Sequence, residues 1–111
     1  MYLRIKQQTI RYRISKIEAE KLINDELLYD SLDLTENLRL SYSVASTKNH
    51  SNFSFDPDAN LLNLKINKKE LLKELEDRPS KKGIEVSETL SKSKILSVFL
   101  EIDIKKVKIK Q

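Results

Sequence analysis

Three arginines near the start of the chain have the residue type and spacing best suited to chemistry. Arg4 lies in a segment that alternates apolar and basic residues, and Arg11 and Arg13 lie in a second such segment. If Gln7 and Gln8 form a two-residue turn between antiparallel strands, Arg4 faces Arg11 on one side of a hairpin. A guanidinium can donate two parallel hydrogen bonds to a phosphate or a carboxylate. This face therefore has the chemistry to bind an anion or a nucleic acid.

Two acidic residues late in the chain offer these arginines a different partner. Glu101 and Asp103 share one face of the longest predicted strand. Like charges that face each other across a strand pair cost a few tenths to about 1 kcal/mol unless something offsets them. If the long strand lies next to the hairpin, the acids offset the arginines and the cluster is structural. We favour this interpretation. The alternatives are anion or nucleic-acid binding, with Tyr2 stacking beside the arginines, and an unpaired solvated face.

The other candidate motifs favour structure over chemistry. The segment Asp56–Asn60 resembles the start of a calcium loop, but Leu61 and Asn67 stand where an EF-hand needs Gly and Glu. His50 is the only histidine and lies in a polar loop, and the chain has no Cys and one Gly. Disulfides, thiolate catalysis and glycine-rich phosphate loops are therefore excluded. We predict a hairpin turn at 56–60, no catalytic residue, no cofactor and no metal site.

The elements that must position these residues follow from the hydropathy pattern. Two capping patterns, Ser15-Lys-Ile-Glu18 and Asn67-Lys-Lys-Glu70, predict helices over 16–24 and 68–77. We recognise no internal repeat. Because the first half of the last strand is apolar on both faces, we expect that strand to be central in its sheet. Alternation predicts strands at 2–6, 9–14, 27–34, 37–45, 53–55, 61–66, 84–88 and 94–104.

Length and charge limit the class of protein. A chain of 111 residues can form one domain, which we place at 1–111. The net charge of +4 is uneven, because residues 1–21 carry six basic and two acidic side chains and residues 22–59 carry two and seven. Basic and acidic regions of one chain can pair with each other or with outside partners. No segment is apolar enough to be a signal peptide or a membrane span, so we expect a cytoplasmic protein without a membrane partner.

The N-terminal residues resemble a family of small uncharacterised bacterial proteins, typified in Bacteroidetes. The family pattern is Met-x-(Ile/Leu)-Arg-Ile-Lys, a short turn, and Ile-Arg-x-Arg-(Leu/Ile)-(Ser/Thr), which matches Met1–Lys6 and Ile10–Ser15. Leu40–Val44 and Leu100–Lys105 match two weaker motifs. Relatives often place Gly-Asn-Ser where this chain has Gln7-Gln8-Thr9. The resemblance implies a domain of unknown function and supplies no catalytic residues.

These observations predict an α+β domain with a mostly antiparallel sheet of about six to eight strands and two short helices. The sheet can curl toward a half-barrel. We expect a non-enzymatic domain whose partner is another protein or a second copy of the chain. The alternative is an anion or nucleic-acid binder using Arg4, Arg11 and Arg13. An enzyme acting on a small phosphorylated substrate has the least support.

Overall fold

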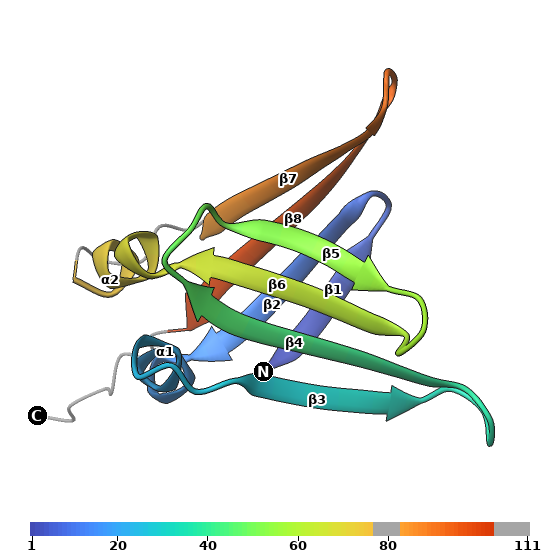
Figure 1. Cartoon of the computed structure of the whole chain (residues 1–111), viewed down its shortest axis with the longest axis horizontal. Helices are drawn as coiled ribbons and strands as arrows, with labels where there is room; N and C mark the ends of the chain where they lie inside the picture. The colour runs from blue at the N-terminus through green and yellow to red at the C-terminus, as the bar shows by residue number, and fades with distance from the viewer. Residues whose placement is uncertain (77–82, 104–111) are drawn as a thin grey trace, which may run out of the picture.

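The fold is described from a computed structural model that covers residues 1–76 and 83–103. This part of the chain forms eight strands and two helices, which confirms the predicted α+β class (Figure 1). Helix α1 spans Lys16–Ile23 and helix α2 spans Lys68–Glu76. The expected last residues of the second helix and of the last strand, most of the predicted loop at 78–83 and the tail at 105–111 lie outside the described residues.

The strands are divided between two sheets, whereas the sequence predicted one. In each sheet the two central strands run parallel and each outer strand runs antiparallel to its neighbour, so most pairs are antiparallel as expected. The longest strand is central, as predicted. Sheet A has the order β1 (Tyr2–Lys6), β2 (Thr9–Ser15), β8 (Lys94–Asp103) and β7 (Ile84–Ser91). Sheet B has the order β3 (Leu28–Asp33), β4 (Arg39–Thr47), β6 (Leu61–Asn67) and β5 (Asn52–Asp56).

The two halves of the chain repeat one order of elements, although their sequences show no repeat. The first half reads β1-β2-α1-β3-β4 and the second reads β5-β6-α2-β7-β8. Strand β2 pairs in parallel with β8, and its counterpart β6 pairs in parallel with β4. The registers also correspond, because one parallel ladder ends at Ser15 and Asp103 and the other ends at Asn67 and Thr47. Each half therefore completes its sheets only by pairing with the other half.

The first hairpin has the register that its sequence predicts. Arg4 faces Arg11 and Ile5 faces Ile10. Gln7, the first residue of the two-residue turn, has a positive φ of 54°. This is the region that a primed hairpin turn requires and that favours Gly. The turn therefore adopts a backbone conformation that favours Gly, although Gln7 occupies this position.

Both helices begin directly after a strand, at a capping side chain. The Ser15 hydroxyl accepts a hydrogen bond from the Glu18 amide at 3.1 Å, and the Glu18 carboxylate accepts one from the Ser15 amide. At the equivalent place, the Asn67 side chain accepts hydrogen bonds from the amides of Lys69 and Glu70. These contacts satisfy amide groups that have no partner inside the helix. The caps mark where β2 and β6 give way to helices, and both helices lie at the same end of the molecule (Figure 1).

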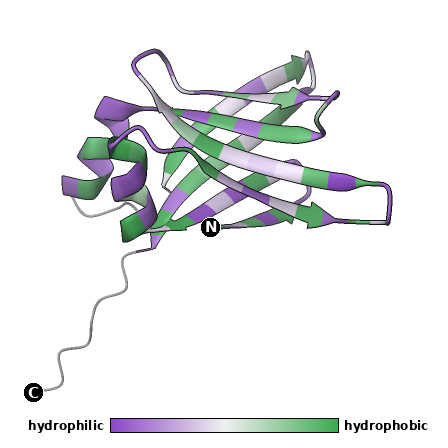
Figure 2. Cartoon of the chain, turned by 60° about the horizontal axis from the view of Figure 1, so that its bottom comes forward, coloured by the Kyte–Doolittle hydropathy of each residue, from purple (hydrophilic) through white to green (hydrophobic). Residues whose placement is uncertain are grey.

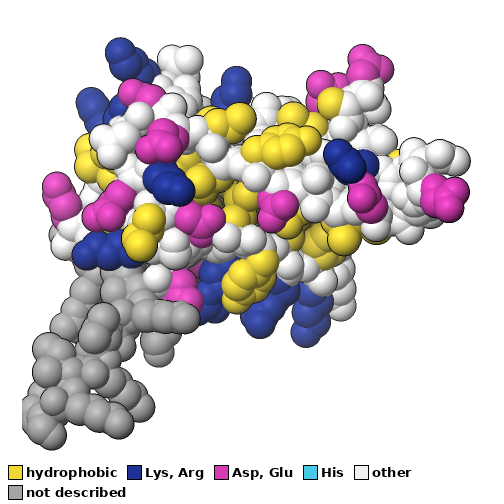
Figure 3. All heavy atoms as spheres, turned by 90° about the horizontal axis from the view of Figure 1, so that it is seen from below, with side chains coloured by type: hydrophobic (Ala, Val, Ile, Leu, Met, Phe, Trp, Pro, Cys, Tyr) yellow, Lys and Arg dark blue, Asp and Glu magenta, His cyan; other side chains and the backbone are white. Residues whose placement is uncertain are grey.

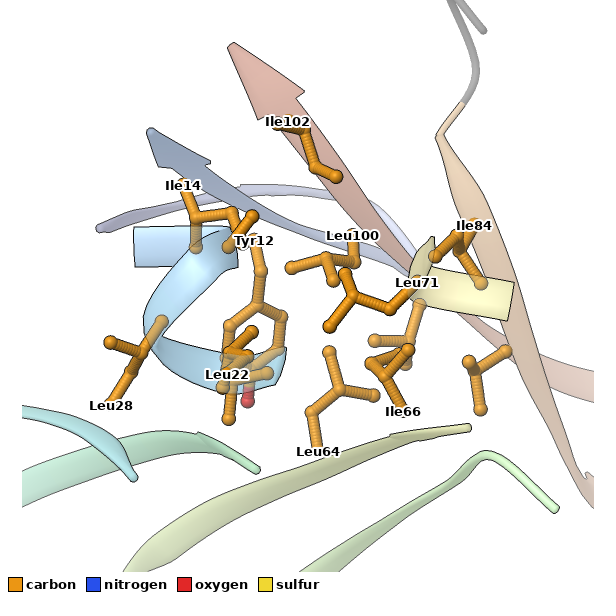
Figure 4. Close-up of a cluster of buried hydrophobic side chains, with 14 of the residues drawn as sticks. Tyr12, Ile14, Leu22, Leu28, Leu64, Ile66, Leu71, Ile84, Leu100 and Ile102 are labelled. Atoms are coloured by element: carbon orange, nitrogen blue, oxygen red, sulfur yellow. The ribbon is translucent and has the colours of Figure 1, made fainter. Parts of the chain in front are cut away.

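The core lies between the two sheets and is closed at one end by the helices (Figure 4). Along β2, apolar side chains alternate with polar ones, whereas the middle of β8 is apolar on both faces (Figure 2). Leu22 of α1 and Leu71 of α2 are fully buried. Tyr12 of sheet A is also fully buried, and its hydroxyl donates to the Leu62 carbonyl of sheet B at 3.3 Å. Burial raises the pKa of Tyr12, which therefore stays neutral in this setting.

The edge strands of the two sheets are in closer contact on one side of the molecule than on the other. The edge strands β5 and β7 lie against each other. Their counterparts in the repeat, β1 and β3, form no such contact zone. Both pairs of edge strands diverge with distance from the helices (Figure 1). We call the gap between β1 and β3 the open side. At this side the fold departs from its own internal repeat.

Candidate functional site

The arginine face predicted from the sequence is the outer face of sheet A. In the strand register, Arg11 of β2 stands between Arg4 of β1 and Phe99 of β8. One row further along, Arg13 stands next to Glu101. Because β2 and β8 are parallel neighbours, the basic residues of one and the acidic residues of the other share this face.

Two of the three arginines are paired with the acids of β8. Arg11 Nη1 lies 2.9 Å from Glu101 Oε2. Arg13 Nη2 lies 3.3 Å from Asp103 Oδ1, and Arg13 Nη1 lies 4.0 Å from Glu101 Oε1. The Glu101 side chain is 19% exposed and the two arginine side chains are about one-third exposed. A hydrogen bond and charge attraction from Asp103 raise the pKa of Arg13. These contacts offset the repulsion within the hairpin.

Phe99 is part of this cluster, and the sequence did not single it out. Its ring packs under the Arg11 guanidinium, with 4.3 Å between Cζ and the ring centroid. Phe99 is buried although it lies on the outer face. The cation–π contact and the Glu101 bond together hold Arg11 in one place. The sequence feature that could have indicated Phe99 is the apolar character of both faces of β8. Only the strand register shows which arginine covers its ring.

Arg4 is not brought together with the acids. It lies on β1, and β2 separates β1 from β8. Within the described parts of the chain, neither Arg4 nor Lys6 forms an ion pair. Both line a polar surface hollow of about 340 Å³ together with Gln7, Thr9 and Arg11. In Figure 3, Lys and Arg side chains gather along the lower side of the molecule. Two cations on β1 are thus left without an ion-pair partner among the residues that the structure describes.

The open side exposes apolar side chains that point toward the core layer. Ile5 of β1 shares a face with buried Ile10 and Tyr12, yet it is 61% exposed. Leu32 of β3 shares a face with buried Leu28 and is 53% exposed. The sheets diverge toward the ends of β1 and β3, so no described element covers these residues. Figure 3 shows hydrophobic side chains in the opening between the upper and lower layers.

The other sequence candidates have local roles. The Asp56 carboxylate accepts hydrogen bonds from the amides of Asp58 and Ala59 in the turn between β5 and β6. His50 is exposed, and its carbonyl accepts a hydrogen bond from Asn52. Among the residues the structure covers, no group of three His, Cys, Asp or Glu side chains is placed to hold a metal ion. None of the described helices is long and apolar enough to cross a membrane.

The comparison with protein families gives one match. The model of a family of unknown function, DUF7009, matches residues 1–110. The chain belongs to this family. No curated protein and no solved structure matches the chain. The family assignment covers the hairpin, the acids of β8 and both edges of the open side, and it names no activity for them.

Proposed function

We propose that this chain is a non-enzymatic protein-interaction domain whose partner binds at the open side between β1 and β3. The observation that supports this best is the exposure of Ile5 and Leu32, two aliphatic side chains on the core-facing sides of their strands. Aliphatic side chains on the core-facing side of an edge strand lose contact with water when another molecule covers them, which favours binding there. The N-terminal motif further supports a bacterial, Bacteroidetes-type origin, and we propose a cytoplasmic location.

The arginine cluster supports an architectural role over a catalytic one. The carboxylates of Glu101 and Asp103 are engaged by Arg11 and Arg13, so they already have fixed partners. An acid–base catalyst needs a carboxyl group that faces a substrate and exchanges protons with it. In our proposal the cluster joins β2 to β8 and keeps the first hairpin rigid beside the open side.

A site-specific photo-crosslinker tests the proposal. It replaces Leu32 at the open side or, as a matched control, Ser54, which is exposed on the other face of sheet B. Each variant is irradiated in extract from the source cells, with and without excess unlabelled protein. We expect a protein adduct at position 32 that unlabelled protein competes away and that is absent at position 54. Equal labelling at both positions would contradict the proposal.

Anion or nucleic-acid binding is the second candidate, and it is supported by the unpaired Arg4 and Lys6 beside their polar hollow. Phosphate contacts of this kind weaken steeply as salt rises. Fluorescence anisotropy with a labelled single-stranded oligonucleotide at low salt tests it. Binding that weakens with added salt and is lost in Arg4→Ala/Lys6→Ala would favour this function. Undetectable binding at low salt would eliminate it.

A further inference from the structure

We infer that β1 binds an extended segment of a partner protein as an added strand, and that the segment alternates acidic and apolar residues. This inference rests on the proposed function and specifies how the partner binds. It is carried by three features of β1, which are its free backbone groups, its two unpaired cations and its exposed apolar side chain.

The outer edge of β1 has backbone groups available for a new strand. In a two-residue hairpin, the residues that flank the turn exchange both backbone hydrogen bonds. Here Lys6 pairs with Thr9 next to the turn, so every second residue of β1 points its amide and carbonyl toward β2. Leu3 and Ile5 therefore point theirs away from β2, where no described strand pairs with them. Free groups of this kind are the template for strand addition.

The side chains of β1 determine the pattern of the segment. Arg4 and Lys6 lie on the outer face of sheet A, so residues opposite them on an added strand are best acidic. Leu3 and Ile5 lie on the core-facing side, so residues opposite them enter the gap between the sheets and are best apolar. Cross-strand partners of this kind contribute to stability on both faces.

The same charges disfavour a second copy of the chain as the occupant. An antiparallel pair of β1 strands would bring the Arg4 and Lys6 side chains of the two copies together on one face, which is destabilising. The other free edge, β3, carries Asp33 on its outer face, but Asp33 already pairs with Arg39 at 2.8 Å. A separate segment with unpaired acidic residues complements β1 better than either edge of this chain does.

The internal repeat indicates where an added strand would fit. On the closed side, β5 is the counterpart of β1, and it lies against β7. On the open side, β3 does not reach β1 in the same way. A strand on β1 would fill this gap and cover the exposed Ile5 side chain.

Labelled synthetic peptides test the inference by fluorescence anisotropy on the full chain. One peptide alternates Glu and Val, a second has the same composition with Glu and Val in separate blocks, and a third alternates Lys and Val. We expect the Glu–Val peptide to bind best. The charge reversal Arg4→Glu/Lys6→Glu should weaken its binding about tenfold or more and should create binding of the Lys–Val peptide. Equal binding of alternating and blocked peptides, or no peptide binding, overturns the inference.

A proline substitution separates strand addition from simple charge attraction. Ile5→Pro removes an amide that points to the free edge and leaves the β1–β2 hydrogen bonds in place. Ile5→Ala is the matched control for the lost side chain. Loss of peptide binding in Ile5→Pro but not in Ile5→Ala, with unchanged circular dichroism, supports strand addition. Equal binding by both variants overturns it. A specific crosslink at position 32 without peptide binding would leave the proposed function standing and reject only this partner.

Discussion

Arg4, Arg11 and Arg13 are chemically alike, and their different roles come from strand position. Arg11 and Arg13 lie on β2, one strand spacing of about 5 Å from the acids of β8. Arg4 lies on β1, two spacings away, and has no ion pair within the described residues. The sequence grouped the three because they share one face. Only the strand order shows which of them is free to bind.

Substitution of Glu101 should lower the free energy of unfolding, because it weakens the ion pairs of Arg11 and Arg13. Glu101→Gln removes the charge that Arg11 and Arg13 share. Because these side chains are partly exposed and solvent screens them, we expect a loss of about 1 kcal/mol in the free energy of unfolding. Urea denaturation measures this loss, which should shrink at high salt. Glu85→Gln on the same sheet face is the control, because within the described residues the Glu85 carboxylate accepts a hydrogen bond only from nearby Ser87. Equal effects of the two substitutions would contradict the structural role of Glu101.

Substitution of Gln7 by glycine should stabilise the protein. Gln7 has a φ of 54°, which costs a residue with a side chain roughly 1–2 kcal/mol. Part of the gain is offset because glycine makes the unfolded chain more flexible, so we expect Gln7→Gly to add about 0.5–1 kcal/mol. Thermal unfolding measures it. Gln8→Gly is the control. Gln8 has no positive φ, so glycine at this position should destabilise the protein. A gain at Gln8 equal to that at Gln7 would refute the explanation.

At the scale of elements, one ion pair joins the end of α1 to the start of α2. Asp25 follows α1, and Lys68 is the first residue of α2. The distance between Asp25 Oδ1 and Lys68 Nζ is 2.7 Å. A cation at a helix N-terminus is unfavourable, and the Asp25 carboxylate offsets it. A hydrogen bond and charge attraction from Lys68 lower the pKa of Asp25. The contact links the two halves of the chain at the closed end of the core.

The lowered pKa of Asp25 sets the direction of a pH effect. A carboxyl group whose pKa is lower in the folded state contributes stability above its unfolded pKa of about 3.9. That contribution is lost as the pH falls through the folded value. Asp25→Asn should therefore be less stable than the wild type at neutral pH, and the two should converge in acid. Chemical denaturation across pH measures this, and a constant difference between the two proteins would contradict it.

At the scale of the whole molecule, the parallel pairs β2–β8 and β4–β6 make the halves interdependent. Residues 1–51 contain β1 to β4, but these four strands belong to two different sheets. A fragment of residues 1–51 should therefore lack a stable tertiary structure, and mixing it with residues 52–111 should restore the fold. Amide NMR spectra of the fragments, alone and mixed, measure this. A folded monomeric fragment 1–51 would show that the halves are independent.

The sequence by itself determined the local structure of this protein. Side-chain alternation and a two-residue turn specified the first hairpin down to the pairing of Arg4 with Arg11, because a one-residue slip would put the apolar side chains of one strand on the basic face of the other. Capping side chains specified where both helices begin, because free amides at a helix start need nearby acceptors. These features depend on neighbours within a few residues.

The tertiary structure alone decided how these local units combine. Whether β2 pairs with β8, whether the strands form one sheet or two, and whether β1 and β3 meet all depend on contacts between residues far apart in the chain. Alternation states which face of a strand is apolar and leaves open which strand lies beside it. The cationic face of the N-terminal hairpin could therefore be predicted from the sequence. Its unpaired edge, where we propose that a partner binds, became visible only in the folded molecule.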